Sequence, residues 1–229
     1  MSSPIVKIFP SDLQKALVIL HQKIAHSNRI NKLAKVIGKT INDLFPSQIP
    51  TINLLDVGCG DMRLAEKIEM DCPHSKWTCT DIHELPTELK QSEKWKKYIP
   101  FDGTRLPFAD SSFDVVLFSD VLHHCLPEAI TLLQEARRVG RYIIVKDHFE
   151  HGVFSRQVLR LMDWVGNYGY GVSVPDQYFT KERFFLAADK AGFKVLKLHE
   201  TMALYPVYLS PILRPNLQFL AVLDKKATC

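Results

Sequence analysis

The sequence predicts a doubly wound α/β fold, in which helices cover both faces of a mostly parallel sheet. Three observations predict it. From residue 51 onward, short apolar runs alternate with amphipathic stretches of helical length. A turn that contains Gly58 and Gly60 follows the first of these runs. Two further helical patterns precede the first predicted strand, so we expect two extra N-terminal helices.

The predicted elements follow one another in a regular order. The first N-terminal helix begins at Ser11, with Gln14 at the reciprocal capping position, and the second runs from about Asn31 to Leu44. Seven strands are expected, at 53–57, 77–81, 99–101, 115–119, 142–146, 195–198 and 219–223. Helices are expected between them, near 61–71, 87–97, 127–138, 153–166 and 181–191.

Length and composition indicate one globular unit. The 229 residues, 46% hydrophobic and 24% charged, are enough for one large core. We expect a single domain over residues 1–229, with a helical cap at 1–48 and a core at 49–229. Insertions at about 151–180 and 202–215 are expected on the substrate side.

Charge and cysteine content argue against several classes of protein. The net charge of +4 is mild, and the seven basic side chains of residues 1–50 are too sparse for a strong nucleic-acid signal. Five cysteines without a C-x-x-C pair fit no closed disulfide framework, so a cytoplasmic location is expected. No apolar run reaches the roughly 18 residues of a transmembrane segment.

The first predicted strand ends in a glycine turn. The run Leu54–Arg63 places Asp56 at the strand end and Gly58, Cys59 and Gly60 in a turn that opens a helix. Glycine permits the tight turn, and the unpaired amides of a helix start bind a phosphate or a carboxylate. A plain tight turn explains the same residues, so the turn alone does not identify a ligand.

An acidic residue ends the second predicted strand. Asp81 follows Gly60 by 21 residues, and an acid at this place accepts both hydroxyls of an adenosine ribose. Sites for nicotinamide dinucleotides and for S-adenosylmethionine both use such an acid. A dinucleotide fingerprint needs a third glycine at position 63, where this chain has Arg63. The sequence therefore disfavours a dinucleotide.

A third run points to a family. Residues Phe101–His124 read FDGTRLPFADSSFDVVLFSDVLHH. The run resembles the segment of small-molecule methyltransferases of the ubiquinone and menaquinone C-methyltransferase type, in which an aspartate precedes a Leu-Pro-Phe turn and a buried fourth strand. Together with LLDVGCG and TCTDI, the resemblance covers roughly residues 50–148. It implies a class I, Rossmann-like methyltransferase that uses S-adenosyl-L-methionine.

The resemblance also implies which residues meet the cofactor. They are Asp56, Gly58, Cys59, Gly60, Asp81, Ile82, Asp102, Gly103, Ser119 and Asp120. In this assignment Asp81 binds the ribose, Ile82 lies against the adenine, and Asp102 accepts from the adenine amino group. One departure is Met62, which stands where the family often has a glycine.

Polar residues follow the fourth and fifth predicted strands, where a doubly wound fold binds its substrate. His124, Asp147 and His148 are candidates for a general base or for orienting the acceptor, because imidazole titrates near neutral pH and a carboxylate can hold it. Capping or packing roles explain the same histidines. The histidines and Cys125 in this region match no familiar zinc spacing, so we expect no metal site.

Aromatic side chains follow the fifth predicted strand. The stretch Trp164–Tyr178 mixes aromatic and glycine residues, as is typical of a substrate wall, and Tyr205 and Tyr208 lie in the later insertion. Such a roof indicates an apolar or aromatic small-molecule acceptor. A lipid-like acceptor would bring peripheral contact with a membrane.

Three functions stay open from the sequence. The first is in-line transfer of a methyl group to a small molecule. The second is an RNA or protein methyltransferase that uses the basic N-terminal helices; it is disfavoured because SDVL, residues 119–122, stands where many amino-group methyltransferases have an N-P-P-Y run. The third is a non-catalytic adenosyl-binding module. The acceptor, the methylated atom and the oligomeric state are not determined by the sequence.

Overall fold

A six-stranded sheet forms the centre of the computed structural model, which describes residues 27–45, 51–85, 93–167 and 172–226. The strands are β1 (Ile52–Val57), β2 (Ser75–Thr80), β3 (Phe113–Ser119), β4 (Gly140–His148), β5 (Phe193–His199) and β6 (Gln218–Lys225). Their order across the sheet is β2-β1-β3-β4-β6-β5. The strands from β2 to β4 are parallel, whereas β6 runs antiparallel to both β4 and β5.

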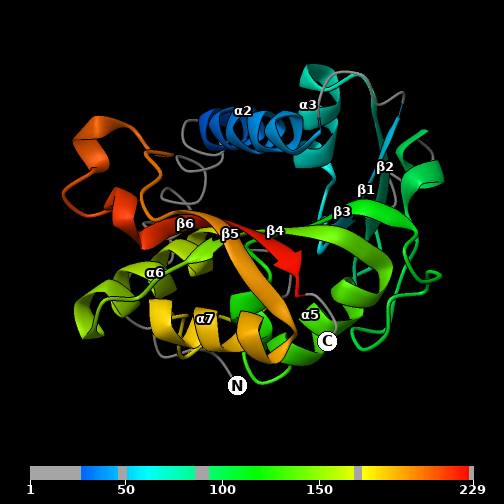
Figure 1. Ribbon diagram of the computed structural model, residues 1–229. Helices are drawn as coiled ribbons and strands as arrows, with labels where there is room; N and C mark the ends of the chain where they lie inside the picture. The colour runs from blue at the N-terminus through cyan, green and yellow to red at the C-terminus, as the bar shows by residue number, and fades with distance from the viewer. Residues whose placement is uncertain (1–26, 46–50, 86–92, 168–171, 227–229) are drawn as a thin grey trace.

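Helices cover both faces of this sheet, as the sequence predicts (Figure 1). The α-helices are α2 (Ser27–Leu44), α3 (Arg63–Asp71), α5 (Ala129–Val139), α6 (Val153–Gly166) and α7 (Lys181–Lys190), and the short 3-10 helices are η3 (Glu93–Lys97), η4 (Leu122–Cys125), η5 (Val207–Leu209) and η6 (Pro215–Leu217). Helices α2 and α3 pack on one face, and α5 and α7 pack on the other.

The side chains of β3 pack into the hydrophobic cores on both faces of the sheet. Val115 and Leu117 belong to the core under α2 and α3, whereas Val116 and Phe118 belong to the core under α5 and α7. Successive side chains of a strand point to opposite faces. A continuous apolar run is therefore what a strand covered on both sides requires.

The prediction of seven strands is wrong, because residues 99–101 do not form a strand. The Ile99 amide donates to the Cys79 carbonyl at 2.9 Å, and the Phe101 amide donates to the Asp81 carbonyl at 3.2 Å. The Ile99 carbonyl, however, accepts from the side-chain hydroxyl of Thr80 at 2.5 Å. This segment forms only an isolated parallel bridge with β2, between Tyr98 and Cys79, so β2 is the edge strand of the sheet.

The predicted N-terminal helices have different outcomes. The helix expected from Ser11 lies outside the described residues, as do residues 86–92 of the helix expected near 87–97. The second N-terminal helix is confirmed as α2, which is helical from the first described residue, Ser27, and so extends further than expected; Ile30 lengthens the buried stripe that continues through Leu33 and Ile37.

The carboxyl ends of β1, β2, β3 and β4 meet at one edge of the sheet, where open α/β folds bind ligands. Strand β6 begins at that same edge, and its first residue, Gln218, lies opposite His148. In the part of the chain that the structure describes, no helix is long and apolar enough to cross a bilayer.

Candidate active site

Two glycines shape the turn after β1, and they do so for different reasons. Gly58 has φ +75°, and a Cβ there would lie 2.4 Å from Cγ2 of Val121. Gly60 has φ +51°, but a Cβ there would meet no atom within 4 Å. Close packing inside the protein therefore requires Gly58, whereas the space over Gly60 is open to a ligand.

Asp81 ties this turn to the end of β2. Its carboxylate is 7% exposed and accepts from the Gly60 amide and from the His83 amide, each at 2.9 Å. These two bonds reach different oxygens, and an ionised carboxylate offers about four lone-pair sites. Asp81 can therefore hold the turn and still accept ligand hydroxyls.

An apolar surface continues from Asp81 along the same edge. Ile82 is 60% exposed, and a Cβ on Gly103, which has φ +84°, would lie 3.2 Å from Cγ2 of Ile82. Asp102 instead folds back on its own loop, where its Oδ1 accepts from the Thr104 amide at 2.8 Å and from the Thr104 hydroxyl at 2.7 Å. The exposed isoleucine and the bare glycine leave a flat apolar platform for a planar ring.

Buried acid and thiol groups support the turn from below. Asp56 is 2% exposed, and burial, assisted by the charge of Asp81, raises its pKa to about 7. The Cys59 thiol is also buried, and its hydrogen bond with Cys79 is the main reason that its pKa lies above the ordinary value. Neither group offers a charge that a ligand in the turn would meet at acidic pH.

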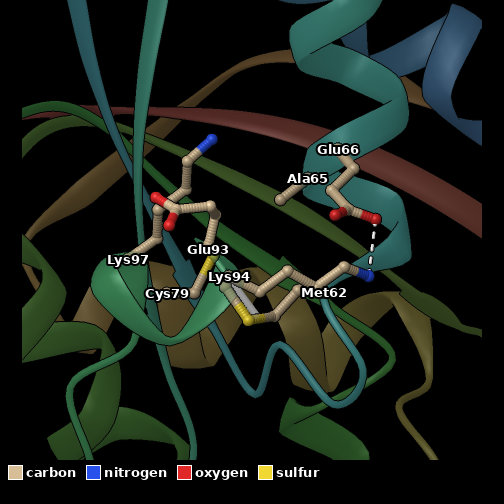
Figure 2. Close-up of a pocket in the computed structure, with 7 residues that line it drawn as sticks. All are labelled: Met62, Ala65, Glu66, Cys79, Glu93, Lys94 and Lys97. Atoms are coloured by element: carbon tan, nitrogen blue, oxygen red, sulfur yellow. Dashed lines mark ion pairs between the residues drawn. The ribbon is translucent and has the colours of Figure 1, made fainter. Parts of the chain in front are cut away.

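Met62 adopts the backbone conformation of the glycine that it replaces. Its φ is +65°, in the left-handed region, and its side chain is 1% exposed. The strain of a non-glycine residue there costs about 1–2 kcal/mol, which burial of the thioether side chain offsets. Behind it, a pocket between α3 and η3 is lined by Met62, Ala65, Glu66, Cys79, Glu93, Lys94 and Lys97 (Figure 2). An ion pair of 2.7 Å between Lys94 and Glu66 lies at this pocket.

Beyond the end of β3, charged side chains rather than backbone groups form the site. Ser119 is the last residue of β3, and Asp120 follows with φ +60°. The Asp120 carboxylate forms ion pairs with Arg29 of α2 and with Lys146 of β4. Burial alone would raise the pKa of Asp120, but these two cations outweigh it and hold the pKa well below its ordinary value. Asp120, predicted to meet the cofactor, is thus a centre of ion pairing.

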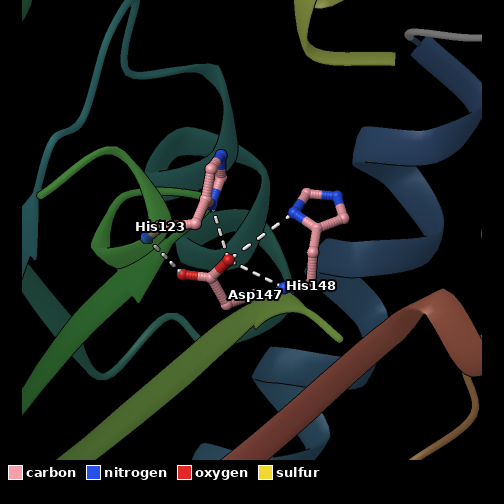
Figure 3. Close-up of side chains that lie close together, drawn as sticks. All are labelled: His123, Asp147 and His148. Atoms are coloured by element: carbon pink, nitrogen blue, oxygen red, sulfur yellow. Dashed lines mark hydrogen bonds and ion pairs between the residues drawn. The ribbon is translucent and has the colours of Figure 1, made fainter. Parts of the chain in front are cut away.

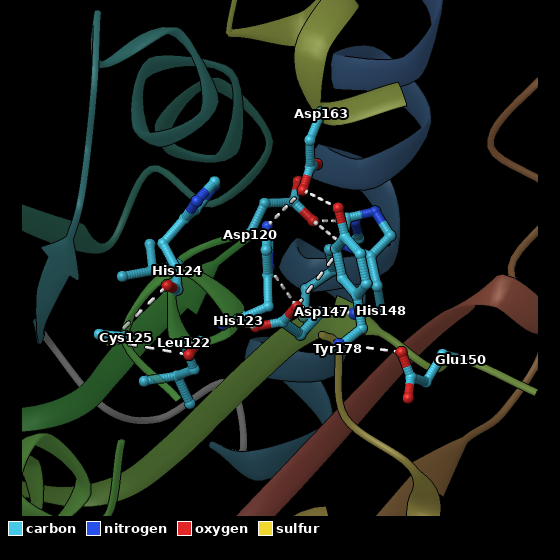
Figure 4. Close-up of polar contacts among 12 residues, drawn as sticks. Asp120, Leu122, His123, His124, Cys125, Asp147, His148, Glu150, Asp163 and Tyr178 are labelled. Carbon is cyan, nitrogen blue, oxygen red and sulfur yellow. Dashed lines mark hydrogen bonds and ion pairs between the residues drawn. The ribbon is translucent and has the colours of Figure 1, made fainter. Parts of the chain in front are cut away.

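A second buried network is built around His123. Its Nδ1 lies 2.6 Å from Asp147, and its Nε2 lies 3.1 Å from Asp163 (Figures 3 and 4). The Tyr178 hydroxyl donates to the same Asp163 carboxylate at 2.6 Å. Burial lowers the pKa of His123, but the two carboxylates outweigh burial and raise it well above the ordinary value. His123 is therefore a buried imidazolium between two carboxylates.

The two networks together are electrically balanced. Within them, Arg29, Lys146 and His123 carry positive charge, and Asp120, Asp147 and Asp163 carry negative charge. Burial of an unpaired ion is costly, so such a cluster persists only when its charges match. Burial lowers the pKa of Lys146 to about 8, and its neighbour Asp120 keeps it from falling further.

The predicted histidines occupy two different environments. His148 is 3% exposed, and burial followed by the charge of Lys146 lowers its pKa. His124 lies on the outer side of η4, with Nδ1 3.2 Å from the Ser173 carbonyl, and burial lowers its pKa to about 4. Asp147 accepts from the His148 amide at 2.7 Å, so it joins His148 to His123.

Several groups near His148 have polar atoms without a hydrogen-bond partner in the described chain. They are His148 Nδ1, both amide atoms of Gln218, Arg29 Nε, and His123 Nε2, which keeps only the 3.1 Å ion-pair contact with Asp163. His148 and Gln218 lie opposite one another on β4 and β6. Buried polar groups in proteins are normally paired, and exceptions concentrate at sites of function. These atoms lie beside the buried ion-pair network at the carboxyl end of β4.

Metal ligation was not expected, yet two groups of side chains have suitable ligand atoms. These are His123, Asp147 and His148, and His123, His124 and Asp163, with ligand atoms within 4.8 Å of one another. The hydrogen bond from His123 to Asp147 and the raised pKa of His123 already account for the arrangement by internal ion pairing.

Sequence reasoning did not assign Arg29 or Asp163 to the site and considered His123 only as a metal ligand. It expected Tyr178 in an aromatic substrate wall, but Tyr178 is fully buried, and residues 168–171 of that stretch lie outside the described residues. One signal in the sequence could have indicated Asp163. It is a charged residue on the apolar face of the predicted helix, one turn after Leu159, and so was placed to be buried.

Comparison with known proteins relates this geometry to one kind of domain. Residues 55–142 match a family model described as a methyltransferase domain. The sequence is 26% identical over 187 residues to sterol methyltransferase-like 1 from Botryococcus braunii, a match that covers 77% of this chain. The chain spans 43% of the length of that relative.

Solved structures resemble the fold over most of the chain. The CurJ carbon methyltransferase superposes with a TM-score of 0.60 at 19% identity, over 99% of this chain and 62% of that one. An S-adenosylmethionine-dependent methyltransferase from Thermotoga maritima gives 0.59 at 17% identity, over 94% and 99%. Another from Aquifex aeolicus gives 0.54 at 15% identity, over 83% and 89%.

Proposed function

We propose methyl transfer to a small-molecule acceptor as the reaction of this chain, because the chain belongs to the class I S-adenosylmethionine-dependent methyltransferases. One observation carries the proposal. Asp81, bound to the open Gly60 turn, stands beside the exposed Ile82 and the bare Gly103 at the edge where β1 and β2 end. Along this edge the Gly60 turn, then Asp81, then Ile82 with Gly103 are in the order needed to meet an amino-acid group, a ribose and a purine.

The residues present fit S-adenosyl-L-methionine. In our proposal the Gly58–Gly60 turn with Asp56 and Cys59 takes the methionine part, and Ser119 offers its backbone to the same group. Asp81 accepts the ribose hydroxyls, Ile82 covers the adenine, and Asp102 with Gly103 lines its edge. The bound cofactor supplies an activated methyl group on a positively charged sulfur, so the protein's own task is mainly orientation and exclusion of water.

On the acceptor side we assign His148 the role of proton acceptor or orienting group. Its lowered pKa leaves the imidazole neutral near pH 7, and a neutral imidazole can take a proton. His124, with a pKa of about 4, is a weak base at that pH, so we assign it orientation only. Asp147 holds His123 and the His148 backbone, and we assign it a positioning role.

An apolar acceptor is the finer part of the proposal. The relative from Botryococcus braunii is named for a sterol, and the CurJ protein is named a carbon methyltransferase. Tyr205 contributes an aromatic side chain that packs against the core under α2, close to Arg29. An aromatic wall beside a few polar groups suits a largely apolar small molecule.

The test combines cofactor binding with turnover. Calorimetry should show that Asp81→Ala loses S-adenosylmethionine binding, whereas His148→Gln keeps it. With methyl-tritiated cofactor and a lysate of small molecules, wild type should label an extractable product, and His148→Gln should label it at least tenfold more slowly. Asp176→Ala, at a surface carboxylate whose side chain is 91% exposed, is the matched control and should behave as wild type.

Three results would overturn the proposal. Unchanged cofactor binding in Asp81→Ala would remove the assigned site. Label that appears in RNA or protein instead of the small-molecule fraction would change the acceptor class. Binding without any labelled product would indicate an adenosyl-binding module.

A further inference from the structure

We propose that one face of this chain docks on the surface of an anionic lipid bilayer. The face carries five large apolar side chains that water reaches, which we call the apolar rim. They are Val153, Phe154, Val207, Tyr208 and Ile212, with exposed fractions of 70%, 70%, 86%, 72% and 56%. Single exposed apolar residues are ordinary on protein surfaces, but a group of them marks a contact surface.

The apolar rim is one surface, although its residues come from two distant segments. The start of α6 and the loop that holds η5 border one groove, in which Phe154 and Val158 face Ile212 and Leu217. Beneath it, Val158, Leu213 and Leu217 share a small core. In Figure 1 the η5 loop and α6 lie at the same end of the sheet, the loop above β6 and α6 below it. Phe154 and Ile212 therefore border a common groove, with Val153 next to Phe154 in α6 and with Val207 and Tyr208 in the same loop as Ile212.

The loop that presents the rim is held by its own backbone. The Leu209 amide donates to the Pro206 carbonyl at 2.9 Å, and the Leu213 amide donates to the Leu209 carbonyl at 2.7 Å. The loop base is closed by a bond of 2.9 Å from the Met202 amide to the Pro215 carbonyl. Val207 and Tyr208 are thus exposed on an ordered turn.

Charge identifies the partner. Neither residues 151–162 nor residues 201–223 contain an aspartate or glutamate. Arg214, at the groove, is exposed and forms no ion pair with the described residues, whereas Arg156 is held by Glu150 at 2.7 Å. Apolar side chains beside an unpaired cation, in two segments that contain no acidic residue, complement acyl chains beneath anionic headgroups. Tyrosine is also favoured at that depth of a bilayer.

Other exposed apolar residues provide the contrast. Leu186 of α7 and Leu196 of β5 are 54% and 48% exposed. Their segments, KERFFLAADK and FKVLKLH, carry charged residues of both signs or repeated lysines around them. They are scattered single residues, so substitutions there serve as controls of matched chemistry.

The experiment is co-sedimentation of the full chain with vesicles, without cofactor or acceptor. Wild type should sediment with phosphatidylcholine vesicles that contain phosphatidylserine. The double variant Val207→Ser/Tyr208→Ser should bind at least tenfold more weakly, and Arg214→Glu should lose the preference for anionic vesicles. The control Leu186→Ser/Leu196→Ser should sediment as wild type. All of these positions are exposed, and circular dichroism checks that each variant is folded.

Several outcomes would overturn the docking surface. In the first, the wild-type protein stays in the supernatant with these vesicles. In the second, the control variant loses as much binding as the rim variant. A concentration-dependent dimer in sedimentation velocity that the rim variant abolishes would assign the rim to a second copy of the chain. Because no cofactor is present, failure here leaves the methyl-transfer proposal unaffected.

Discussion

The two halves of the candidate site are built by different means. On the side of β1 and β2, backbone amides and glycines form the surface, and Asp81 is the main charged group that holds them. On the side of β3, β4 and α6, six charged side chains hold one another, four of them buried and two, Arg29 and Asp120, half-buried. The first half is open where a ligand is needed, whereas the second half is closed and stabilised by ion pairs. In the proposed function the first half takes the constant cofactor and the second half supports the variable acceptor, so the two halves meet different demands.

The largest expected effect comes from removing the central cation of the second half. His123→Leu leaves Asp147 and Asp163 facing one another without their shared imidazolium. Breaking a buried ion pair in this way lowers the free energy of unfolding by about 3–5 kcal/mol. Urea unfolding measures it.

The same variant tests whether the halves are separate. Calorimetry at a temperature where His123→Leu is folded should give a cofactor Kd close to that of wild type. A Kd that weakens in step with stability would show that the ion-pair network also shapes the cofactor side, and the comparison would fail.

Asp56, which lies beneath the glycine turn of the first half, should make the stability of the protein depend on pH. An unfolded aspartate ionises near pH ~4, and the folded pKa of Asp56 is about 7, so the folded state holds a proton that the unfolded state has lost. Stability is then greatest below the unfolded pKa and falls as pH rises through the folded pKa, by roughly 3–4 kcal/mol.

Asp56→Asn should remove this component of the pH dependence. The difference in urea midpoint between about pH 5 and about pH 8 should shrink relative to wild type. Asp110→Asn, at a carboxylate whose side chain is 77% exposed, is the control and should leave the difference unchanged. An undiminished difference in Asp56→Asn would place the titration elsewhere.

The two glycines of the turn allow a sharper test within the first half. Gly58→Ala forces a methyl group against Val121 and should lower the free energy of unfolding by about 1–3 kcal/mol. Gly60→Ala meets no protein atom and should cost only about 1 kcal/mol from its positive φ. It should nevertheless weaken cofactor binding by about tenfold, because its methyl group enters the ligand space.

Thermal unfolding and calorimetry on both glycine variants separate these effects. Equal losses of cofactor affinity and of stability at the two positions would contradict the separate reasons given for the two glycines.

The smallest effect is expected at a surface ion pair. Asp176 lies 2.8 Å from Arg160 but its side chain is 91% exposed. Asp176→Ala should change the free energy of unfolding by at most about 0.5 kcal/mol, because water screens the pair. A loss comparable with that of His123→Leu would mean that burial does not set the energy of these pairs.

The fold class and the covered faces of the sheet could be predicted from the sequence because those signals are local. Apolar runs identify strands, and the Gly58–Gly60 turn with Asp81 lies within 24 residues. The ion pair between Arg29 and Asp120 joins residues 91 apart, and no local pattern encodes it. The apolar pattern at 99–101 likewise did not show that this segment forms only an isolated bridge with β2.

The ion pairs of Asp120 have a consequence for protein engineering. The methyltransferase-domain match covers residues 55–142, which include Asp120. Both of its counter-charges, Arg29 and Lys146, lie outside those boundaries, one before and one after. A chimera that exchanges only the matched segment would transplant a carboxylate without the cations that neutralise it. Grafts of this cofactor module should therefore start before α2 and extend past β4.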